Sequence, residues 1–190
     1  MRATSTEQVS GLLRWANRHG VAVVARGLGS GVVGSGLPVR GGVVLDLSAM
    51  NAIGEVDTVN RTVTVGAANL GEVDGHLAQF GLSVGHYPQS LHLASVGGCI
   101  ARRSGTFSSL WPATSRTAEW VLPTGEVVQT RSMPRALQGI DLKQLLLGSG
   151  GTFGVATQVT LRPVPVPPRA ASRPSATTAS PRRSRRCGAA

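Results

Sequence analysis

The chain has 190 residues, of which 41% are hydrophobic, so it is long enough to bury one ordinary core. It has no apolar run of membrane-spanning length, and its first ten residues, MRATSTEQVS, lack the apolar stretch of a signal peptide. We therefore expect a cytoplasmic protein without a membrane span. Its two cysteines, Cys99 and Cys187, form no disulfide or metal-binding pattern, so we expect no metal.

The formal net charge of +10 comes mostly from the C-terminal end of the chain. Six of the 19 basic residues follow residue 168 with no acidic residue among them, which leaves 13 basic and nine acidic residues before it. Residues 166–190 are rich in Ser, Pro, Ala and Arg and have no hydrophobic periodicity, which predicts a disordered basic tail. Such a tail attracts phosphates nonspecifically, and we expect no specific nucleic-acid partner.

The first third of the chain predicts one helix followed by strands. Ser5 and Gln8 have the spacing of a capping box, and an apolar stripe follows them, so we expect an amphipathic helix over residues 6–18. Short apolar and alternating runs predict strands at 21–25 and 43–47, and a hairpin over residues 53–67.

The rest of the chain adds two helices and further strands. The helical spacing of Leu70, Val73, Leu77 and Phe80 before Gly81 predicts a second helix with a glycine stop. We also expect a hairpin over residues 119–130 around Pro-Thr-Gly, a short helix over 141–148 and a strand over 155–161. The fold class that these elements predict is α+β.

The stretch ARGLGSGVVGSG, residues 25–36, contains the G-x-G-x-x-G spacing of a dinucleotide-binding turn. A Rossmann turn must open a helix and be followed, about 20 residues later, by an acidic residue for the ribose. Here Pro38, two glycines and a strand follow, and Asp46 comes too early. The loop therefore connects two strands. It can be an anion-binding nest, because glycines let consecutive backbone N–H groups converge, or merely a flexible turn.

Three further segments, in order, give the loop a context: residues 85–109, 121–130 and 141–165. Together with the loop and residues 41–73, they resemble the FAD-binding domain of the vanillyl-alcohol oxidase / p-cresol methylhydroxylase (PCMH) type. The similarity is greatest to its alkyldihydroxyacetonephosphate synthase-like and D-lactate dehydrogenase-like branch. It implies a two-subdomain FAD-binding domain over residues 1–165, incomplete at its N-terminus, with FAD between the subdomains.

The resemblance implies three sets of cofactor-binding residues. The first set would hold the pyrophosphate: Arg26, Gly27, Leu28, Gly29, Ser30, Gly31, Val32, Val33 and Gly34. The second would lie along the phosphates and the flavin: Pro88, Gln89, Ser90, Ser95, Val96, Gly97 and Gly98. The third would close over the adenosine: Gly151, Thr152, Gly154, Val155 and Thr157.

Some of these positions also have purely structural explanations. Gly97 and Gly98 can serve tight packing at the start of a helix, and Ser95 can be only its N-cap. His86 and His92 raise the possibility of a covalent flavin, since some members of the wider family tether FAD through histidine. The most similar branch implies noncovalent FAD.

The chain departs from the family pattern in several places. It lacks the cap domain that binds substrate in relatives, so a small-molecule substrate is expected only where a cap domain is supplied. Leu28 replaces a usual glycine, and Gly150 a usual glutamate. Residues 111–117 and 169–190 differ from the family, and a GC-rich encoding read two nucleotides later restores family-like residues. We therefore expect a truncated, partly frame-shifted fragment, or sequencing errors near codons 110, 118 and 168.

The resemblance implies an FAD-binding flavoprotein domain of an FAD-linked oxidoreductase that acts on a hydroxy acid or an alcohol. No residue can be nominated as the catalytic base, so the catalytic residues stay unknown. Two alternatives are open. One is a flavin-dependent transferase like alkyldihydroxyacetonephosphate synthase, and the other is an inactive, truncated remnant that folds poorly.

Overall fold

The structure is a computed structural model that describes residues 1–106, 109–110, 115–130 and 140–166. Residues 167–190 of the predicted tail and the first four residues of the segment 111–117 lie outside the described residues, so the frame-shift hypothesis is not tested there. None of the helices in the described part of the chain combines the length and hydrophobicity that crossing a bilayer requires.

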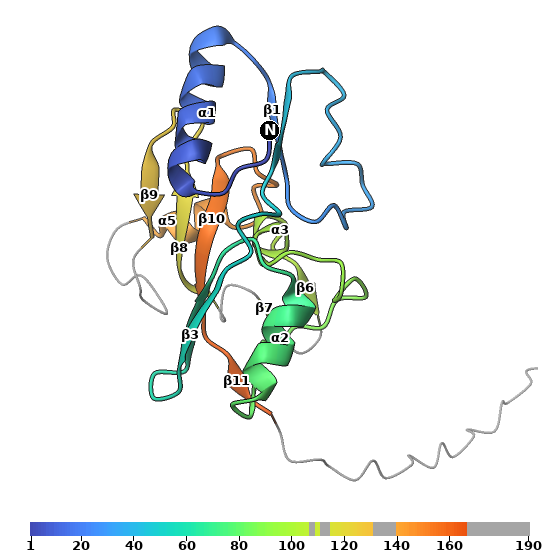
Figure 1. The fold of residues 1–190 in the computed structure, drawn as a ribbon, viewed down its shortest axis with the longest axis vertical. Coiled ribbons are helices and arrows are strands. Elements are labelled where there is room, and N and C mark those ends of the chain that lie inside the picture. Colours follow the sequence, from blue (N-terminus) through green and yellow to red (C-terminus); the bar gives the residue numbers. More distant parts are fainter. Residues whose placement is uncertain (107–108, 111–114, 131–139, 167–190) are drawn as a thin grey trace, which may run out of the picture.

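Helices and strands follow one another in a mixed order, which confirms the α+β class (Figure 1). The helices are α1 (Thr6–His19), α2 (Leu70–Ala78), α3 (Val96–Ala101) and α5 (Leu142–Leu146). The first strands are β1 (Val23–Arg26), β2 (Val43–Asp46), β3 (Ile53–Asp57), β4 (Thr62–Val65) and β5 (Leu82–Ser83). The later strands are β6 (Gly105–Thr106), β7 (Ser109–Leu110), β8 (Ser115–Val121), β9 (Val127–Gln129), β10 (Val155–Leu161) and β11 (Val164–Pro165).

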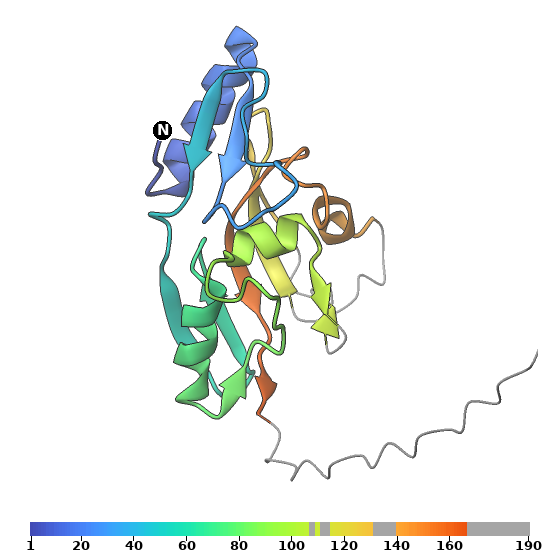
Figure 2. The same ribbon diagram turned by 90° about the vertical axis from the view of Figure 1, so that its right-hand side faces the viewer.

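The N-terminal part combines α1 with the parallel pair β1–β2, which lie side by side in Figure 2. Helix α1 begins as predicted, because the Ser5 side chain accepts a hydrogen bond from the Gln8 backbone N–H, and it ends at Gly20 in the left-handed conformation. Its buried residues Val9 and Leu13 pack with Leu45 of β2 in one hydrophobic cluster. The first subdomain therefore has its own core.

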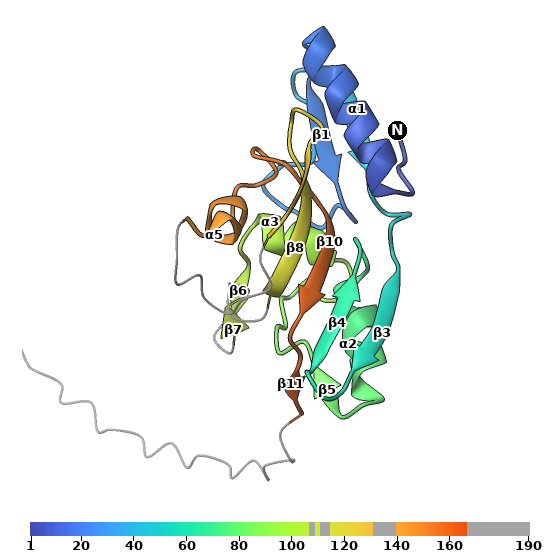
Figure 3. The same cartoon turned by 90° about the vertical axis from the view of Figure 1, so that its left-hand side faces the viewer.

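The second part is built on a five-stranded sheet with the order β3-β4-β10-β8-β9 (Figure 3). Strand β10 is its centre and pairs antiparallel with β4 on one side and with β8 on the other. Both predicted hairpins, β3–β4 and β8–β9, are confirmed as antiparallel pairs. Strand β10, which pairs with β4, comes about 90 residues after it in the chain, so the sheet joins distant parts of the sequence.

Helices α2 and α3 pack with this sheet in the second hydrophobic cluster. That cluster includes Leu77 of α2, Ile100 of α3 and the fully buried Trp120 of β8. The pleat of the central strands sends other side chains to the opposite face, where Val121 and Val155 join the first cluster. The two cores therefore share strands β8 and β10, which hold the subdomains together.

One predicted boundary is wrong. Helix α2 ends at Ala78, so Phe80, which we expected in its apolar stripe, lies beyond the helix and is 45% exposed. Its backbone N–H bonds to the Leu77 carbonyl, three residues back, in the tightened pattern of a helix end. The ring packs edge-on against His76 instead of entering the core.

Candidate functional site

Three chain segments meet between the two cores. They are the loop of residues 27–42 between β1 and β2, which we call the first glycine loop; residues 88–104, which include α3; and the turn at 148–154, which we call the second glycine loop. A Cβ added to Gly27 would lie 2.2 Å from Oγ of Ser95, so only glycine lets the end of β1 come this close to the start of α3.

Three cavities that share lining residues lie along this junction, and together we call them the groove. Their volumes are about 530, 60 and 240 Å³. Ala25 lines all three, Gly98 and Gly150 line the first and the middle cavity, and Gly151 and Gly154 line the middle and the third. The first cavity alone lies within the range of about 300–1,000 Å³ that is usual for small-molecule sites.

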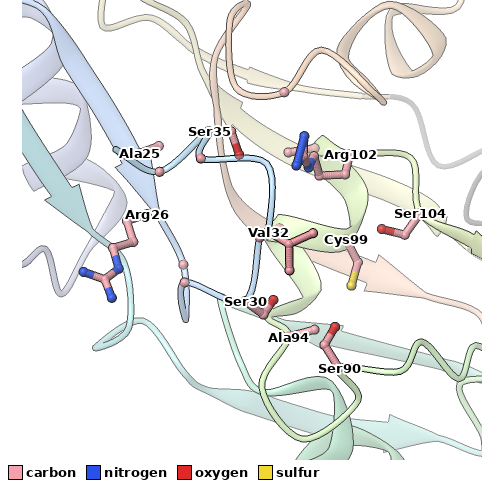
Figure 4. Close-up of a pocket in the computed structure, with 18 of the residues that line it drawn as sticks. Ala25, Arg26, Ser30, Val32, Ser35, Ser90, Ala94, Cys99, Arg102 and Ser104 are labelled. Carbon is pink, nitrogen blue, oxygen red and sulfur yellow. The ribbon is translucent and has the colours of Figure 1, made fainter. Parts of the chain in front are cut away.

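The first cavity is polar and positively charged (Figure 4). Two arginines, Arg26 and Arg102, line it together with backbone of the first glycine loop. Four serines add hydroxyl groups: Ser30, Ser35, Ser90 and Ser104. Among the described residues that line it there is no carboxylate, so this end of the groove can accept an anion.

The third cavity has a different character. Apolar side chains of α1 and β1, such as Leu13 and Val23, form one wall, and Pro123 and the second glycine loop form the other. Its polar side chains are Asn17 and Thr152, and the described residues that line it include no charged group. This end of the groove can therefore accept an uncharged, largely apolar group such as a planar ring.

The described groove residues include no group suited to act as a general base. Cys99 lines the first cavity, but burial raises the pKa of its thiol to about 11, so the thiol is protonated at neutral pH. His86 and His92 line none of the three cavities. His86 is buried, and burial lowers its pKa, which favours the neutral ring. No cluster of metal-ligating side chains occurs among the residues described.

Sixteen of the residues that the resemblance implied line the groove. They are Arg26, Gly27, Gly29, Ser30, Gly31, Val32, Gly34, Pro88, Ser90, Ser95, Gly97, Gly98, Gly151, Thr152, Gly154 and Val155. Ser95 is also the N-cap of α3, as the structural explanation required, and accepts a hydrogen bond from the Gly98 N–H at 3.2 Å.

Five implied residues do not line these cavities: Leu28, Val33, Gln89, Val96 and Thr157. Val96 is fully buried in the second core. Thr157 donates a hydrogen bond to Oε1 of Glu119 at 2.7 Å and is buried as well. A cofactor role for these five residues stays a prediction.

The prediction from sequence did not include several lining residues. Of these, Arg102 and Ser104 are chemically the most distinctive. A usable signal was present in the helical spacing, because Arg102 comes four residues after Gly98 and therefore shares its side of α3. The set predicted in this segment ends at Gly98, because it was chosen for backbone approach to the cofactor, and so it does not reach Arg102.

Known proteins share both this sequence pattern and this fold. A family model described as "FAD binding domain" matches residues 1–131. A Mycobacterium tuberculosis protein named as an FAD-linked oxidoreductase is 36% identical over 168 residues, which are 85% of this chain and 36% of that protein. A D-lactate dehydrogenase of Archaeoglobus fulgidus is 33% identical over 171 residues, covering 87% of this chain and 38% of that protein.

A solved structure of alkyldihydroxyacetonephosphate synthase resembles this fold with a TM-score of 0.79 and 28% sequence identity. The match covers 89% of this chain and 32% of that protein. The chain thus spans about a third of the length of the proteins that it matches.

Proposed function

Because this chain belongs to the FAD-binding domain family of the PCMH type, we propose that the groove between its two glycine loops holds FAD, and holds it noncovalently. The observation that carries the proposal is the change of character from the first to the third of these adjoining cavities. An extended dinucleotide has a charged diphosphate in its middle and planar rings at its ends, and a binding groove must accommodate both.

The first cavity fits the diphosphate. Arg26 and Arg102 supply positive charge, and hydroxyl groups such as that of Ser30 can donate hydrogen bonds. Gly29 has φ +78° and Gly34 has φ +74°, conformations that turn the backbone in ways other residues rarely adopt. A loop of this kind can direct several N–H groups at one anion.

The third cavity fits the adenosine end. Its apolar wall and uncharged lining accept a ring, and Asn17 and Thr152 can hydrogen-bond to its edge. The flavin end would then lie on the far side of the first cavity, near Pro88 and Ser90. Noncovalent binding is supported by the positions of His86 and His92, which line none of the three cavities.

We further propose that the complete enzyme oxidises a small hydroxy acid or an alcohol, as the name of the Archaeoglobus relative suggests. When bound, FAD supplies a hydride acceptor at N5 of its isoalloxazine ring. The residues described here bind and orient the cofactor. Since the groove lacks a general base among these residues, the group that takes the substrate proton would come from outside the groove.

The test is a titration of the purified 190-residue chain with FAD, in which binding is monitored by the quenching of flavin fluorescence. We expect saturable 1:1 binding, competition by ADP, and complete release of FAD on denaturation, as noncovalent binding requires. A soluble, folded chain that leaves FAD fluorescence unchanged would overturn the proposed site. Colourless aggregate would instead support the inactive-remnant alternative. Flavin that stays attached after denaturation would overturn noncovalent binding.

The structural similarity to alkyldihydroxyacetonephosphate synthase supports a flavin-dependent transferase as a second candidate. Both candidates place FAD in the same groove and differ in net redox change. Bleaching of the bound flavin by D-lactate in the absence of oxygen would exclude the transferase.

A further inference from the structure

Two arginines line the first cavity, but they approach it from different elements and are held differently. Arg26 ends β1, and Arg102 is the C-cap residue of α3. Both are exposed, so both are available to a ligand. Their surroundings distinguish them.

Arg26 is turned away from the body of the first glycine loop, as Figure 4 shows. A Cβ added to Gly29 would lie 2.9 Å from both Nε and Nη2 of Arg26, so the guanidinium rests against the backbone at the start of the loop. Asp46 stands opposite Arg26 in the β1–β2 pair, and its pKa is lowered mainly by hydrogen bonds with Ser48 and to a smaller extent by the charges of Arg2 and Arg26. The charge of Arg26 is therefore partly offset within the protein.

Arg102 extends from α3 toward the part of the loop that contains Ser35 (Figure 4). A Cβ added to Gly31 would lie 3.8 Å from Nη2 of Arg102 and 3.6 Å from Oγ of Ser35, so these two polar groups flank the same glycine. The backbone of Arg102 is fixed, because its N–H bonds to the Gly98 carbonyl at 3.1 Å. The guanidinium thus lies beside the loop backbone at Gly31, on the wall of the first cavity.

We propose that Arg102 is the principal phosphate-binding side chain of this domain. Its guanidinium would pair with the same phosphate oxygens that the N–H groups of the first glycine loop bind, with the Ser35 hydroxyl as a second donor. An arginine suits this place because its planar fork can donate two parallel hydrogen bonds to one phosphate. The assignment rests on the proposed FAD site and adds to it the residue that sets affinity for the diphosphate.

The test compares Arg102→Ala with the matched variant Arg26→Ala in FAD titrations of the full chain. Each variant removes one exposed arginine from the same cavity. We expect Arg102→Ala to raise the Kd for FAD by about 10- to 100-fold, the usual effect of losing charged hydrogen bonds, and Arg26→Ala to raise it less than about threefold. Arg102→Lys should recover part of the loss, since it keeps the charge but not the fork.

The salt dependence of the Kd separates a charge-based role of Arg102 from a merely structural one, because loss of a structural residue would not change how the Kd depends on salt. The Kd of the wild-type chain should rise with ionic strength more steeply than that of Arg102→Ala, because the variant has lost the charge that salt screens. Equal losses in the two alanine variants, or an unchanged salt slope in Arg102→Ala, would overturn the assignment to Arg102 while leaving the FAD site intact. A wild-type chain that binds no FAD would overturn both.

Discussion

The two glycine loops line one groove but are held in place in different ways. In the second loop, the N–H groups of Gly148 and Gly150 bond to the carbonyls of Ile100 and Ala101 in α3. In the first loop, the backbone bonds described for residues 28–41 stay inside the loop, for example from Leu37 to Gly34. Val32 in that loop is 96% exposed.

The difference shows that glycine content does not by itself indicate how rigid a binding loop is. The second loop is a preformed wall, because another element of the fold fixes its backbone. The backbone bonds described for the first loop form only local turns, so we expect part of its ordering to accompany ligand binding and to reduce the net affinity. Substitutions in the second loop should therefore affect mainly stability, whereas those in the first should affect mainly binding.

The largest expected effect is a loss of stability in Gly154→Ala. Gly154 has φ +155°, and an added Cβ would lie 2.7 Å from the Val121 carbonyl oxygen, which is fixed in β8. We expect the free energy of unfolding, measured in urea, to fall by about 3 kcal/mol. Gly150→Ala is the control, because Gly150 also has a positive φ but open space around it, and should lose about 1 kcal/mol. Equal losses would contradict a fixed wall.

In the first glycine loop, Gly29→Ala should weaken FAD binding with little loss of stability. Gly29 has φ +78°, and the nearest atoms to an added Cβ belong to the flexible end of Arg26. Because the loop can relax, we expect the free energy of unfolding to fall by less than about 1 kcal/mol and the Kd to rise about fivefold. Gly36→Ala, with nothing near its added Cβ, should leave both unchanged. A drop in stability as large as that of Gly154→Ala would remove the contrast between the loops.

The end of strand β2, which follows the first glycine loop, is held by contacts of Asp46, and pH should reveal their contribution. Asp46 accepts a hydrogen bond from the Ser48 N–H at 2.9 Å, and that contact, followed by the charges of Arg2 and Arg26, lowers its pKa. A depressed pKa contributes stability above the unfolded pKa, and this contribution disappears as pH falls through the folded value.

Urea unfolding at several pH values measures this contribution. The wild-type chain should lose stability between about pH 5 and pH 3, where carboxylates that are stabilised in the folded state become protonated. Asp46→Asn should be less stable near neutral pH and should show a shallower loss over that range. Parallel curves for the two proteins would show that the ionised Asp46 contributes nothing to stability.

The smallest effect is expected at Leu28, the residue that replaces a usual family glycine. Leu28 lines none of the three cavities and is 36% exposed. Leu28→Gly should therefore change the Kd for FAD by less than about twofold. A larger change would mean that the first loop rearranges on binding so that residue 28 reaches the cofactor.

Much of the fold was predictable because local chemistry and tertiary structure agree. Ser5 caps α1, and alternating residues form the two hairpins. The prediction was wrong at Phe80, where apolar spacing continued past the point at which the helix tightens and ends. The pairing of β4 with β10 and the union of two cores through β8 and β10 are not visible in local periodicity, because they depend on distant residues.

The candidate site could be predicted where glycines mark the course of the backbone. It was harder to predict where the direction of a side chain decides whether a residue lines the groove. Gly27 lines the groove where close approach requires glycine, and Gly151 lines it where a φ of +90° favours glycine. The predicted site also included residues next to groove-lining glycines in sequence whose side chains do not face the groove. Val96, which is buried in the second core, is one of them. Arg102 was not predicted for the converse reason, because its contribution depends on a side chain that reaches from the end of α3 to the first glycine loop.

The central position of β10 has a consequence for how the chain folds as it is synthesised. Strand β10 separates β4 from β8 in the sheet, and its first residue, Val155, also belongs to the N-terminal core. Neither core can be completed before residues 155–161 leave the ribosome, so the β3–β4 hairpin emerges first with an unpaired edge. We therefore expect nascent chains that end before residue 155 to stay protease-sensitive and to depend on chaperones.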